Sequence, residues 1–327
     1  MVEVTQEQIG GVTAAALRAH GAAGWIAESV ARAVVEAEAT GNRICGLYYV
    51  ESYCAQLRSG RVAGQVEPRV TRPRPGVVQV DGRMGFAQPA FERALPVALE
   101  AARETGTISL AIGHTHTCTS VGFFTGQLAR AGMIALGMTN ASPIVAPPGG
   151  KTRVIGTNPI AFSVPDGQGG IAMQFDQSTT AVALGRITMA KAAGEAIPEG
   201  WALDAEGQPT TDPDAALSGS LVSSGGYKGW GFGLMAELLA AGLTDSVPST
   251  RVNPLKATEG PPHDLGQFYL VIDPTASPGF ADLVSEVARS VSADPGARMP
   301  GQGKVLVDPV SVDAELWDRI CGLADAS

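Results

Sequence analysis

The sequence predicts an α/β protein, because apolar runs of strand length alternate along it with patterns of helical spacing. Residues 107–113 and 133–139 have the composition of strands, and residues 87–104 form an Ala-rich helical pattern. The sequence contains neither a GxGxxG motif after a strand nor a GxxxxGK[ST] phosphate loop. We therefore expect an α/β fold that lacks an ordinary Rossmann dinucleotide site.

Helical patterns dominate the first sixty residues. Thr5 and Gln8 have the form of a capping box, and Val4 and Ile9 are spaced as a hydrophobic staple. His20 lies near the end of the helix that begins there, so we expect it to be a surface or capping residue. Three helices are expected, over residues 5–20, 22–40 and 48–58.

Later parts of the chain mix strands with helices and loops. Residues 68–75 are rich in Pro and Arg and are expected to connect two lobes. Residues 190–213 are expected to form a surface excursion, and the polar, Pro-rich residues 247–264 a loop. Further strands are expected at 77–80, 160–164, 171–175 and 267–273. Four further helices are expected. One ends near residue 131, one begins at residues 225–229, and two cover residues 280–290 and 313–323.

Composition and charge exclude several classes of protein. A net charge of −9 without a basic run argues against nucleic acid as a partner, because phosphates require a basic face. No uncharged apolar segment of membrane-spanning length and no signal-peptide pattern is visible, so a cytoplasmic protein is expected. The sequence shows no clustered metal ligands, and no metal is expected. The four cysteines form no CxxC pair, so disulfides are not expected either.

Small polar residues gather at the ends of the strands expected between residues 138 and 180. Hydroxyls and free backbone N–H groups at strand ends suit a phosphate-bearing or polar ligand. A β-rich core with ordinary turns is the alternative interpretation of the same stretch. The residues concerned are Asn140, Thr157, Asn158, Asp176, Ser178, Thr179 and Thr180.

Seven short sequence words, taken together, make the chain resemble the type-2 malate/lactate dehydrogenase family of NAD(P)-dependent oxidoreductases. The words appear in the order and spacing of that family over nearly the whole chain. They are Thr139-Asn140, Gly149-Gly150, Gly156-Thr157-Asn158-Pro159, Asp176-Gln177-Ser178-Thr179-Thr180, Gly200-Trp201-Ala202-Leu203-Asp204, Gly225-Gly226-Tyr227-Lys228-Gly229 and Arg298-Met299-Pro300-Gly301.

The resemblance implies a non-Rossmann α/β fold and a homodimer. A mainly helical lobe would be built from residues 1–75 and 275–327, and a mixed-sheet NAD(P)-binding lobe from residues 76–274. A lysine at a helix start, beside backbone N–H groups, makes an anion site suited to a pyrophosphate or a 2′-phosphate. The cofactor, NAD or NADP, is expected to contact Asn140, Asp176, Gln177, Ser178, Thr179, Thr180, Lys228, Gly229, Pro300 and Gly301.

The sequence departs from the family at its usual catalytic positions. The family carries Ser-His-Gly followed three residues on by Arg, where the histidine is the acid/base and the arginine grips the substrate carboxylate. Here Cys45 occupies the histidine position and Tyr49 the arginine position. A thiol is not a cationic acid at pH 7, and a phenol cannot form a bidentate bridge to a carboxylate. The proton chemistry, the substrate, or both are therefore expected to differ.

A second family histidine should fall near residue 117. Ungapped alignment places Thr117 there, with His116 one place earlier, and an extended segment would turn His114 and His116 to the same face. His263 lies in the polar loop and is expected to face solvent. Tyr49 is the first choice of proton donor, with His116, Cys45 and Asp176 as further catalytic candidates. Substrate contacts are expected from Tyr48, Thr117, Thr157 and Asn158.

The leading hypothesis is a divergent NAD(P)H-dependent reductase of a C=O or C=N bond. The resemblance implies small 2-keto acids, 2-hydroxy acids or cyclic 2-imino acids as substrates. The loss of the family His and Arg favours a substrate that depends less on a carboxylate clamp, such as an intermediate of a specialised biosynthetic pathway. The alternative is a repurposed family member that lacks the usual His and Arg and acts as a non-redox enzyme or a binding protein.

Overall fold

A seven-stranded mixed sheet forms the centre of the computed structural model, which describes residues 1–326. The strand order is β2-β3-β4-β11-β5-β6-β7, and every neighbouring pair is antiparallel except β3 and β4. This arrangement confirms the α/β expectation. The strands are β2 (Arg69–Arg74), β3 (Val77–Gly85), β4 (Thr107–Thr115), β5 (Ile134–Thr139), β6 (Ile160–Pro165), β7 (Ile171–Gln177) and β11 (Leu265–Ile272).

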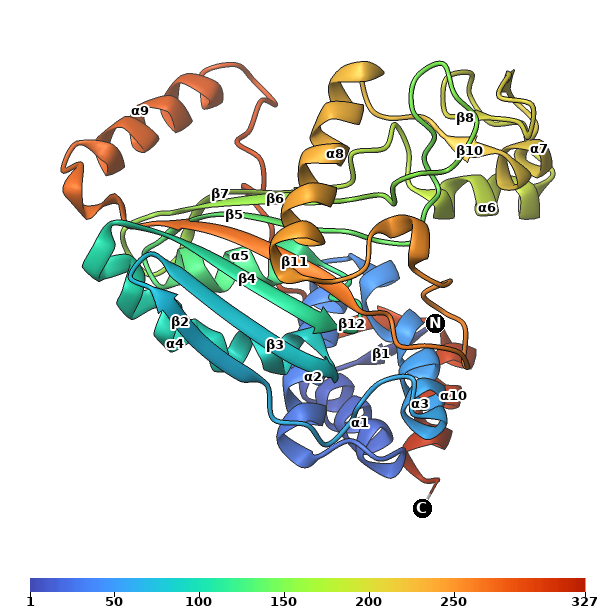
Figure 1. The fold of residues 1–327 in the computed structure, drawn as a ribbon, viewed down its shortest axis with the longest axis horizontal. Helices are drawn as coiled ribbons and strands as arrows, with labels where there is room; N and C mark the ends of the chain where they lie inside the picture. The colour runs from blue at the N-terminus through green and yellow to red at the C-terminus, as the bar shows by residue number, and fades with distance from the viewer. Residues whose placement is uncertain (327) are drawn as a thin grey trace.

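Helices cover both faces of this sheet. Helices α4 (Ala87–Thr105) and α5 (Val121–Arg130) lie against one face, and α8 (Tyr227–Ala240) crosses the other (Figure 1). Beneath α4 and α5, the buried rings of Phe91, Phe124 and Tyr269 pack with centroids 4.9 and 5.4 Å apart. Such edge-to-face aromatic packing, together with Ala-rich helix faces, fixes the helices close to the sheet.

The two ends of the chain share a second core. Helices α1 (Gln6–Ala19), α2 (Gly24–Ala39) and α3 (Val50–Ser59) pack with α10 (Ala314–Ala324), and β1 (Val2–Val4) pairs with β12 (Val310–Val312). The capping box expected at Thr5 and Gln8 is confirmed, with hydrogen bonds in both directions. His20 caps α1, as expected.

A third group of short elements surrounds a small core of its own. Helices α6 (Leu184–Ala193) and α7 (Pro213–Ser218) pack beside a sheet of order β10-β8-β9, formed by Ser220–Leu221, Ala202–Leu203 and Pro209–Thr210. Helix α9 (Phe280–Ser292) has no buried residue and lies at the opposite side of the molecule (Figure 1). Short 3-10 helices complete the fold: η1 (Arg43–Cys45), η2 (Leu47–Tyr49), η3 (Gly242–Thr244), η4 (Ser249–Arg251) and η5 (Pro274–Ala276).

The connector expected at residues 68–75 is wrong. Arg69–Arg74 is β2, an edge strand paired with β3, and an edge strand tolerates Pro73 because one side of it needs no ladder hydrogen bonds. The lobe boundaries at residues 75 and 275 stay a prediction. Within residues 1–326, no helix has both the length and the apolar character needed to cross a membrane.

Candidate active site

Cys45 and Tyr49 stand on two consecutive 3-10 turns, η1 and η2, between α2 and α3. The buried Glu38 side chain fixes these turns, because its Oε1 accepts a hydrogen bond of 2.8 Å from the Leu47 backbone N–H. Gly46 makes room for that carboxylate, since a Cβ at this position would overlap it. The sequence therefore brings Cys45 and Tyr49 to one place through a turn that Glu38 and Gly46 hold.

Three tyrosines continue from this turn into α3. The rings of Tyr48 and Tyr49 meet edge to face at 5.6 Å, and the half-buried Tyr49 stacks on the buried Tyr53 at 5.8 Å. Burial raises the pKa of Tyr49 to about 12, and the neighbouring Cys45 and Tyr48 add to the rise. The Tyr49 phenol is therefore protonated at neutral pH and can donate its proton.

Asp176 reaches the same place from the end of β7. Its Oδ2 accepts hydrogen bonds from Ser120 Oγ at 2.9 Å and from the Gly122 backbone N–H at 2.8 Å, at the start of α5. Asp176 is exposed by its total accessible surface, and these two hydrogen bonds hold its Oδ2 against the start of α5. Desolvation raises the pKa of the Asp176 carboxyl, and the hydrogen bonds from Gly122 and Ser120 and the charge of Lys304 oppose that rise.

Cys45 lies within the electrostatic reach of Asp176. Burial, followed by the negative charge of Asp176, raises the pKa of the Cys45 thiol to about 12, although a hydrogen bond with Asn42 opposes the rise. Cys45 is consequently a neutral thiol at pH 7 and neither an acid of useful strength nor a thiolate nucleophile. The structure thus joins Cys45, Tyr49 and Asp176, three of the four expected catalytic residues.

His116, the fourth, lies in a buried layer behind Tyr53. Its ring is 2% exposed and meets Tyr53 at 5.4 Å, and it stacks on His263 at 3.9 Å. Its Nε2 lies 2.7 Å from Gln56 Oε1, and no hydrogen bond to its Nδ1 forms within residues 1–326. Burial lowers the pKa of His116 well below its usual value, and electrostatic interactions with His263 and Arg61 add to the effect. The catalytic role of His116 stays a prediction.

The solvent-facing position expected for His263 is wrong. The residue is 1% exposed, and its Nδ1 accepts a hydrogen bond of 3.2 Å from the backbone N–H of Thr117. Burial lowers the pKa of His263 to about 3, with the nearby Arg61 adding to the effect. Thr117 is itself buried at this contact, and its substrate role stays a prediction. The polar loop therefore returns to the protein interior at this histidine.

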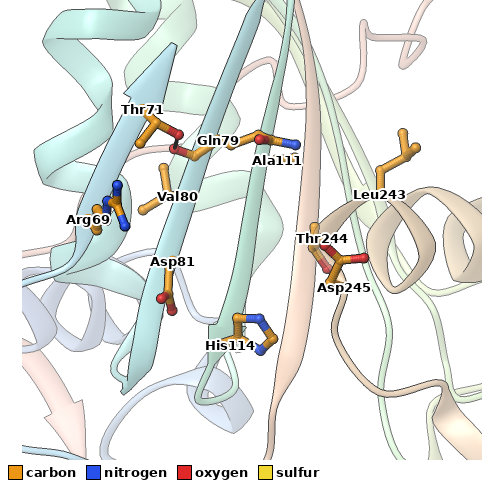
Figure 2. A pocket seen from close by; sticks show the side chains of 10 residues that line it. All are labelled: Arg69, Thr71, Gln79, Val80, Asp81, Ala111, His114, Leu243, Thr244 and Asp245. Atoms are coloured by element: carbon orange, nitrogen blue, oxygen red, sulfur yellow. Dashed lines mark hydrogen bonds between the residues drawn. The ribbon is translucent and has the colours of Figure 1, made fainter. Parts of the chain in front are cut away.

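His114 does not share a face with His116. Its φ of 54° breaks the extended conformation that the alternation requires, and its Nδ1 pairs with Asp264 Oδ1 at 2.8 Å. The side chain borders a polar hollow of about 340 Å³ on the face of the sheet beside η3 (Figure 2). None of the predicted site residues lines that hollow. Its lining includes Arg69, Thr71, Asp81, Thr244 and Asp245.

The residues after Asp176 bind the segment that precedes α8. The Thr179 carbonyl accepts a hydrogen bond of 2.9 Å from the Ser224 N–H, and Thr180 bridges Ser223. The hydroxyls of Ser178 and Thr180 lie 2.8 Å apart, and the preceding Gln177 is exposed. Because of these pairings, the polar residues at the end of β7 lie next to the start of α8.

The start of α8 has the properties of an anion site. Gly225 and Gly226 both have φ of 64°, and no side chain caps the helix, so its first N–H groups stay available. Lys228 is exposed in the first turn. Gly229 permits close packing there, because a Cβ would overlap the Ser224 carbonyl. This donor set fits the phosphates of a nicotinamide dinucleotide.

The Pro300-Gly301 turn packs onto the same strand. The Gln174 N–H of β7 donates to the Pro300 carbonyl at 3.0 Å. Gly301 has φ of 79°, and a Cβ there would come within 2.7 Å of the Gln174 carbonyl. β7 therefore gathers the distant Pro300-Gly301 turn, Asp176 and the Ser178 to Thr180 segment. Their cofactor contacts stay predictions.

Asn140 and Asn158, both expected to contact a ligand, use their side-chain amides for hydrogen bonds within the protein. The Asn140 amide joins Val247 and Gly266, and the fully buried Asn158 amide donates to Gly233 and to Glu237 Oε2. Both residues tie strand ends to the segments packed above them. Thr157 is half-buried, and its carbonyl accepts hydrogen bonds from Thr179. The ligand contacts of Asn140, Thr157 and Asn158 stay predictions.

Sequence reasoning missed Tyr53, Gln56, Lys256 and Lys304. Tyr53 had a usable signal, because it follows Tyr49 by one helical turn. Lys256 Nζ lies 3.5 Å from the centroid of the Tyr48 ring, a long-range contact without a sequence signal. Within residues 1–326, no group of three or more His, Cys, Asp or Glu side chains could hold a metal ion.

The seven-stranded mixed sheet without a GxGxxG motif, with a tyrosine and carboxylate cluster and a candidate anion site, defines the class of a non-Rossmann α/β protein. Residues 4–308 match the family model described as malate/L-lactate dehydrogenase, and the chain belongs to this family of NAD(P)-dependent oxidoreductases.

Relatives with named activities cover most of the chain. It is 42% identical to (2R)-3-sulfolactate dehydrogenase (NADP(+)) of Chromohalobacter salexigens over 88% of this chain and 86% of the relative. It is 36% identical to Delta(1)-pyrroline-2-carboxylate reductase of Ancylobacter novellus over 84% and 82%, respectively. The solved structure of delta1-piperideine-2-carboxylate reductase from Pseudomonas syringae matches with a TM-score of 0.90 and 30% identity, over 99% of this chain and 100% of that one. The non-Rossmann fold implied by the resemblance is confirmed.

Proposed function

We propose that this enzyme reduces a C=O or C=N bond of a small 2-keto acid or cyclic 2-imino acid with NAD(P)H. The observation that carries the proposal is the position of Cys45, which lies beside Tyr49 and within the electrostatic range of Asp176, at the end of β7 that leads into the Ser178 to Thr180 segment. The names of the relatives support this substrate class, since they include a sulfolactate dehydrogenase and pyrroline-2-carboxylate reductases. The 42% identical relative is named as NADP(+)-dependent, so NADPH is the cofactor we propose first.

In this proposal the residues of the chain bind, orient and supply a proton. Ser178, Lys228 and the N–H groups at the start of α8 hold the phosphates of the dinucleotide. A nicotinamide held there would supply the hydride that the carbon of the C=O or C=N bond accepts. The Tyr49 O–H donates its proton to the oxygen or nitrogen of that bond, and solvent returns a proton to the phenolate.

Asp176 and Cys45 have supporting roles in the same proposal. The carboxylate of Asp176 is fixed by Ser120 and Gly122, so its exposed side can orient a polar group of the substrate. Cys45 stays a neutral thiol and fills the position of the family histidine without its charge. Proton supply then rests on Tyr49.

We also propose that the enzyme is a homodimer. Helix α8 presents Tyr227, Phe232 and Leu238 at exposures of 73%, 56% and 68%. Large apolar side chains grouped on one helix are typical of an interface. Light scattering coupled to size exclusion tests this proposal: a mass near twice that of the 33.5 kDa chain supports it, and a monomer contradicts it.

The function is tested by titrating the purified protein with NADPH and NADH in parallel. Oxidation of the bound cofactor is then measured in the presence of 2-keto acids and cyclic 2-imino acids. Micromolar binding together with turnover of a member of this class supports the reductase. The second candidate is a repurposed scaffold, which the loss of the family His and Arg favours. That candidate predicts cofactor binding without turnover, or no binding up to millimolar concentration.

A further inference from the structure

We propose that Lys256 binds the carboxylate of the substrate and thereby replaces the arginine that the family carries at the position of Tyr49. The inference rests on the proposed function and adds to it the group that recognises the anionic end of the substrate. It assigns a role to a residue that lies more than 200 positions from Cys45 and Tyr49 in the chain.

Lys256 lies over the tyrosines that border the candidate active site. Its Nζ is 3.5 Å from the centroid of the Tyr48 ring and 5.7 Å from that of Tyr49. Tyr48 and Lys256 are both exposed, so a ligand can approach the ammonium group from solvent. A cation resting on an aromatic face keeps its hydrogen-bond donors for an anion, because the ring occupies only one side of it.

This ammonium group forms no ion pair with a carboxylate of the described residues. Within residues 1–326, the ion pairs involve other side chains, and Lys256 is in none of them. Two other cations near the site act on protein carboxylates: Lys304 on Asp176 and Glu36, and Arg43 on Glu38. Lys256 thus lies over Tyr48 and near Tyr49 with a charge that no ion pair among residues 1–326 neutralises.

The loop that carries Lys256 is held on both sides of this residue. Gln56 Nε2 donates to the Leu255 carbonyl at 2.8 Å and to the Ala257 carbonyl at 2.7 Å. Arg61 Nη1 donates to the Pro254 carbonyl at 3.0 Å and also to that of Ala257. Because both neighbouring carbonyls are fixed, the backbone at Lys256 is set before a substrate arrives, which lowers the entropy cost of binding.

The buried His116 completes this support. Both N–H groups of Gln56 are used by carbonyls, so Gln56 Oε1 is the acceptor and His116 Nε2 the donor of their 2.7 Å hydrogen bond. His116 thereby fixes the orientation of the Gln56 amide. In this proposal Gln56, Arg61 and His116 are positioning residues, and Lys256 touches the substrate.

The test compares Lys256→Met with the wild type in the full-length enzyme. Steady-state rates with NADPH are measured for the best carboxylate substrate and for its methyl ester. We expect KM for the carboxylate to rise about tenfold or more, because a charge-assisted hydrogen bond is lost, while kcat changes about twofold or less. KM for the uncharged ester should change little, and Lys256→Arg should restore most of the loss.

Binding of oxamate to the enzyme–NADPH complex, followed by NADPH fluorescence, provides a readout without turnover. Lys256→Met should weaken oxamate binding by the same factor as it raises KM, while Lys151→Met, at another exposed lysine, should not. An unchanged KM and unchanged oxamate affinity in an active Lys256→Met enzyme would overturn the inference and leave the reductase intact. A wild type that binds NADPH but neither oxamate nor any carboxylate substrate contradicts the proposed function and this inference together.

Discussion

His116 Nε2 donates a hydrogen bond to Gln56 Oε1 across 2.7 Å, which ties the end of β4 to helix α3. The ring is neutral, since burial lowers the pKa of His116. Its single ring proton therefore points to Gln56. The histidine nearest to the expected family position thus contacts Gln56 and Tyr53, and Tyr53 lies between it and Tyr49. We therefore expect Tyr49, and not His116, to be the proton donor.

Replacing Gln56 should affect substrate binding more than turnover. Gln56→Met releases the Leu255 and Ala257 carbonyls, so Lys256 loses its fixed position. We expect KM for the carboxylate substrate to rise several-fold, roughly 3- to 10-fold, with kcat nearly unchanged. Steady-state kinetics measures this, and Gln65→Met, at an exposed glutamine that binds the Gly21 carbonyl, is the matched control. A fall in kcat with constant KM would count against a positioning role.

Removing the Tyr49 hydroxyl should slow the chemical step. Tyr49→Phe keeps the stacking on Tyr53, so we expect NADPH affinity and thermal stability to persist while kcat falls about 100-fold or more. The raised pKa keeps the phenol protonated as pH rises, until its value of about 12 is approached. If Tyr49 is the donor, we therefore expect its contribution to be nearly independent of pH around neutrality, because the phenol stays protonated well below a pKa of about 12. A Tyr49→Phe enzyme with wild-type kcat would assign the proton to another group.

Lys228 should control cofactor affinity. Lys228→Met removes a cation beside the free N–H groups at the start of α8, and we expect the Kd for NADPH to rise about tenfold at low salt. Fluorescence titration at two ionic strengths measures it, with Lys151→Met as the control. If Lys228→Met binds NADPH as tightly as Lys151→Met does, the phosphates lie elsewhere.

The buried pair of His116 and His263 should make the fold sensitive to acid. Burial lowers the pKa of His263 from the ordinary 6.5 to about 3, and it lowers that of His116 as well. Below the unfolded value of about 6.5, the unfolded chain binds protons that the folded chain does not, so stability falls as pH drops from 6.5 towards 3.

A substitution separates this effect from general acid denaturation. In His263→Asn the side-chain oxygen can still accept from the Thr117 N–H, but the residue no longer titrates. Between pH 7.5 and 5, Tm should decline less steeply for His263→Asn than for the wild type. This difference in slope is expected whichever protein has the higher Tm at pH 7.5. Parallel declines would mean that His263 does not contribute to the pH dependence.

Much of the fold could be predicted from local signals. The Thr5 capping box and the alternation of strand and helix patterns describe interactions within a few residues, and they are confirmed. The connector expected at 68–75 failed because Pro and Arg are typical both of linkers and of edge strands. The strand identity of Arg69–Arg74 depends on its distant partner β3.

The site could be predicted only where a motif carries it. Cys45, Tyr49 and Asp176 stand at family positions and do come together. Asn158 illustrates the limit, because a small polar residue at a strand end serves a buried hydrogen bond to Glu237 as readily as a ligand. The prediction that His114 and His116 share a face was wrong, because His114 has a φ of 54°. The residue types around His114 do not predict this backbone conformation.

The most direct test of the proposed chemistry is a titration of the wild-type protein with NADPH and NADH, followed by single-turnover oxidation of the bound cofactor by a 2-keto acid or a cyclic 2-imino acid. We predict micromolar affinity for at least one cofactor and oxidation that Tyr49→Phe slows about 100-fold. Absence of cofactor binding up to millimolar concentration, or tight binding without oxidation by any member of this substrate class, would contradict the proposal.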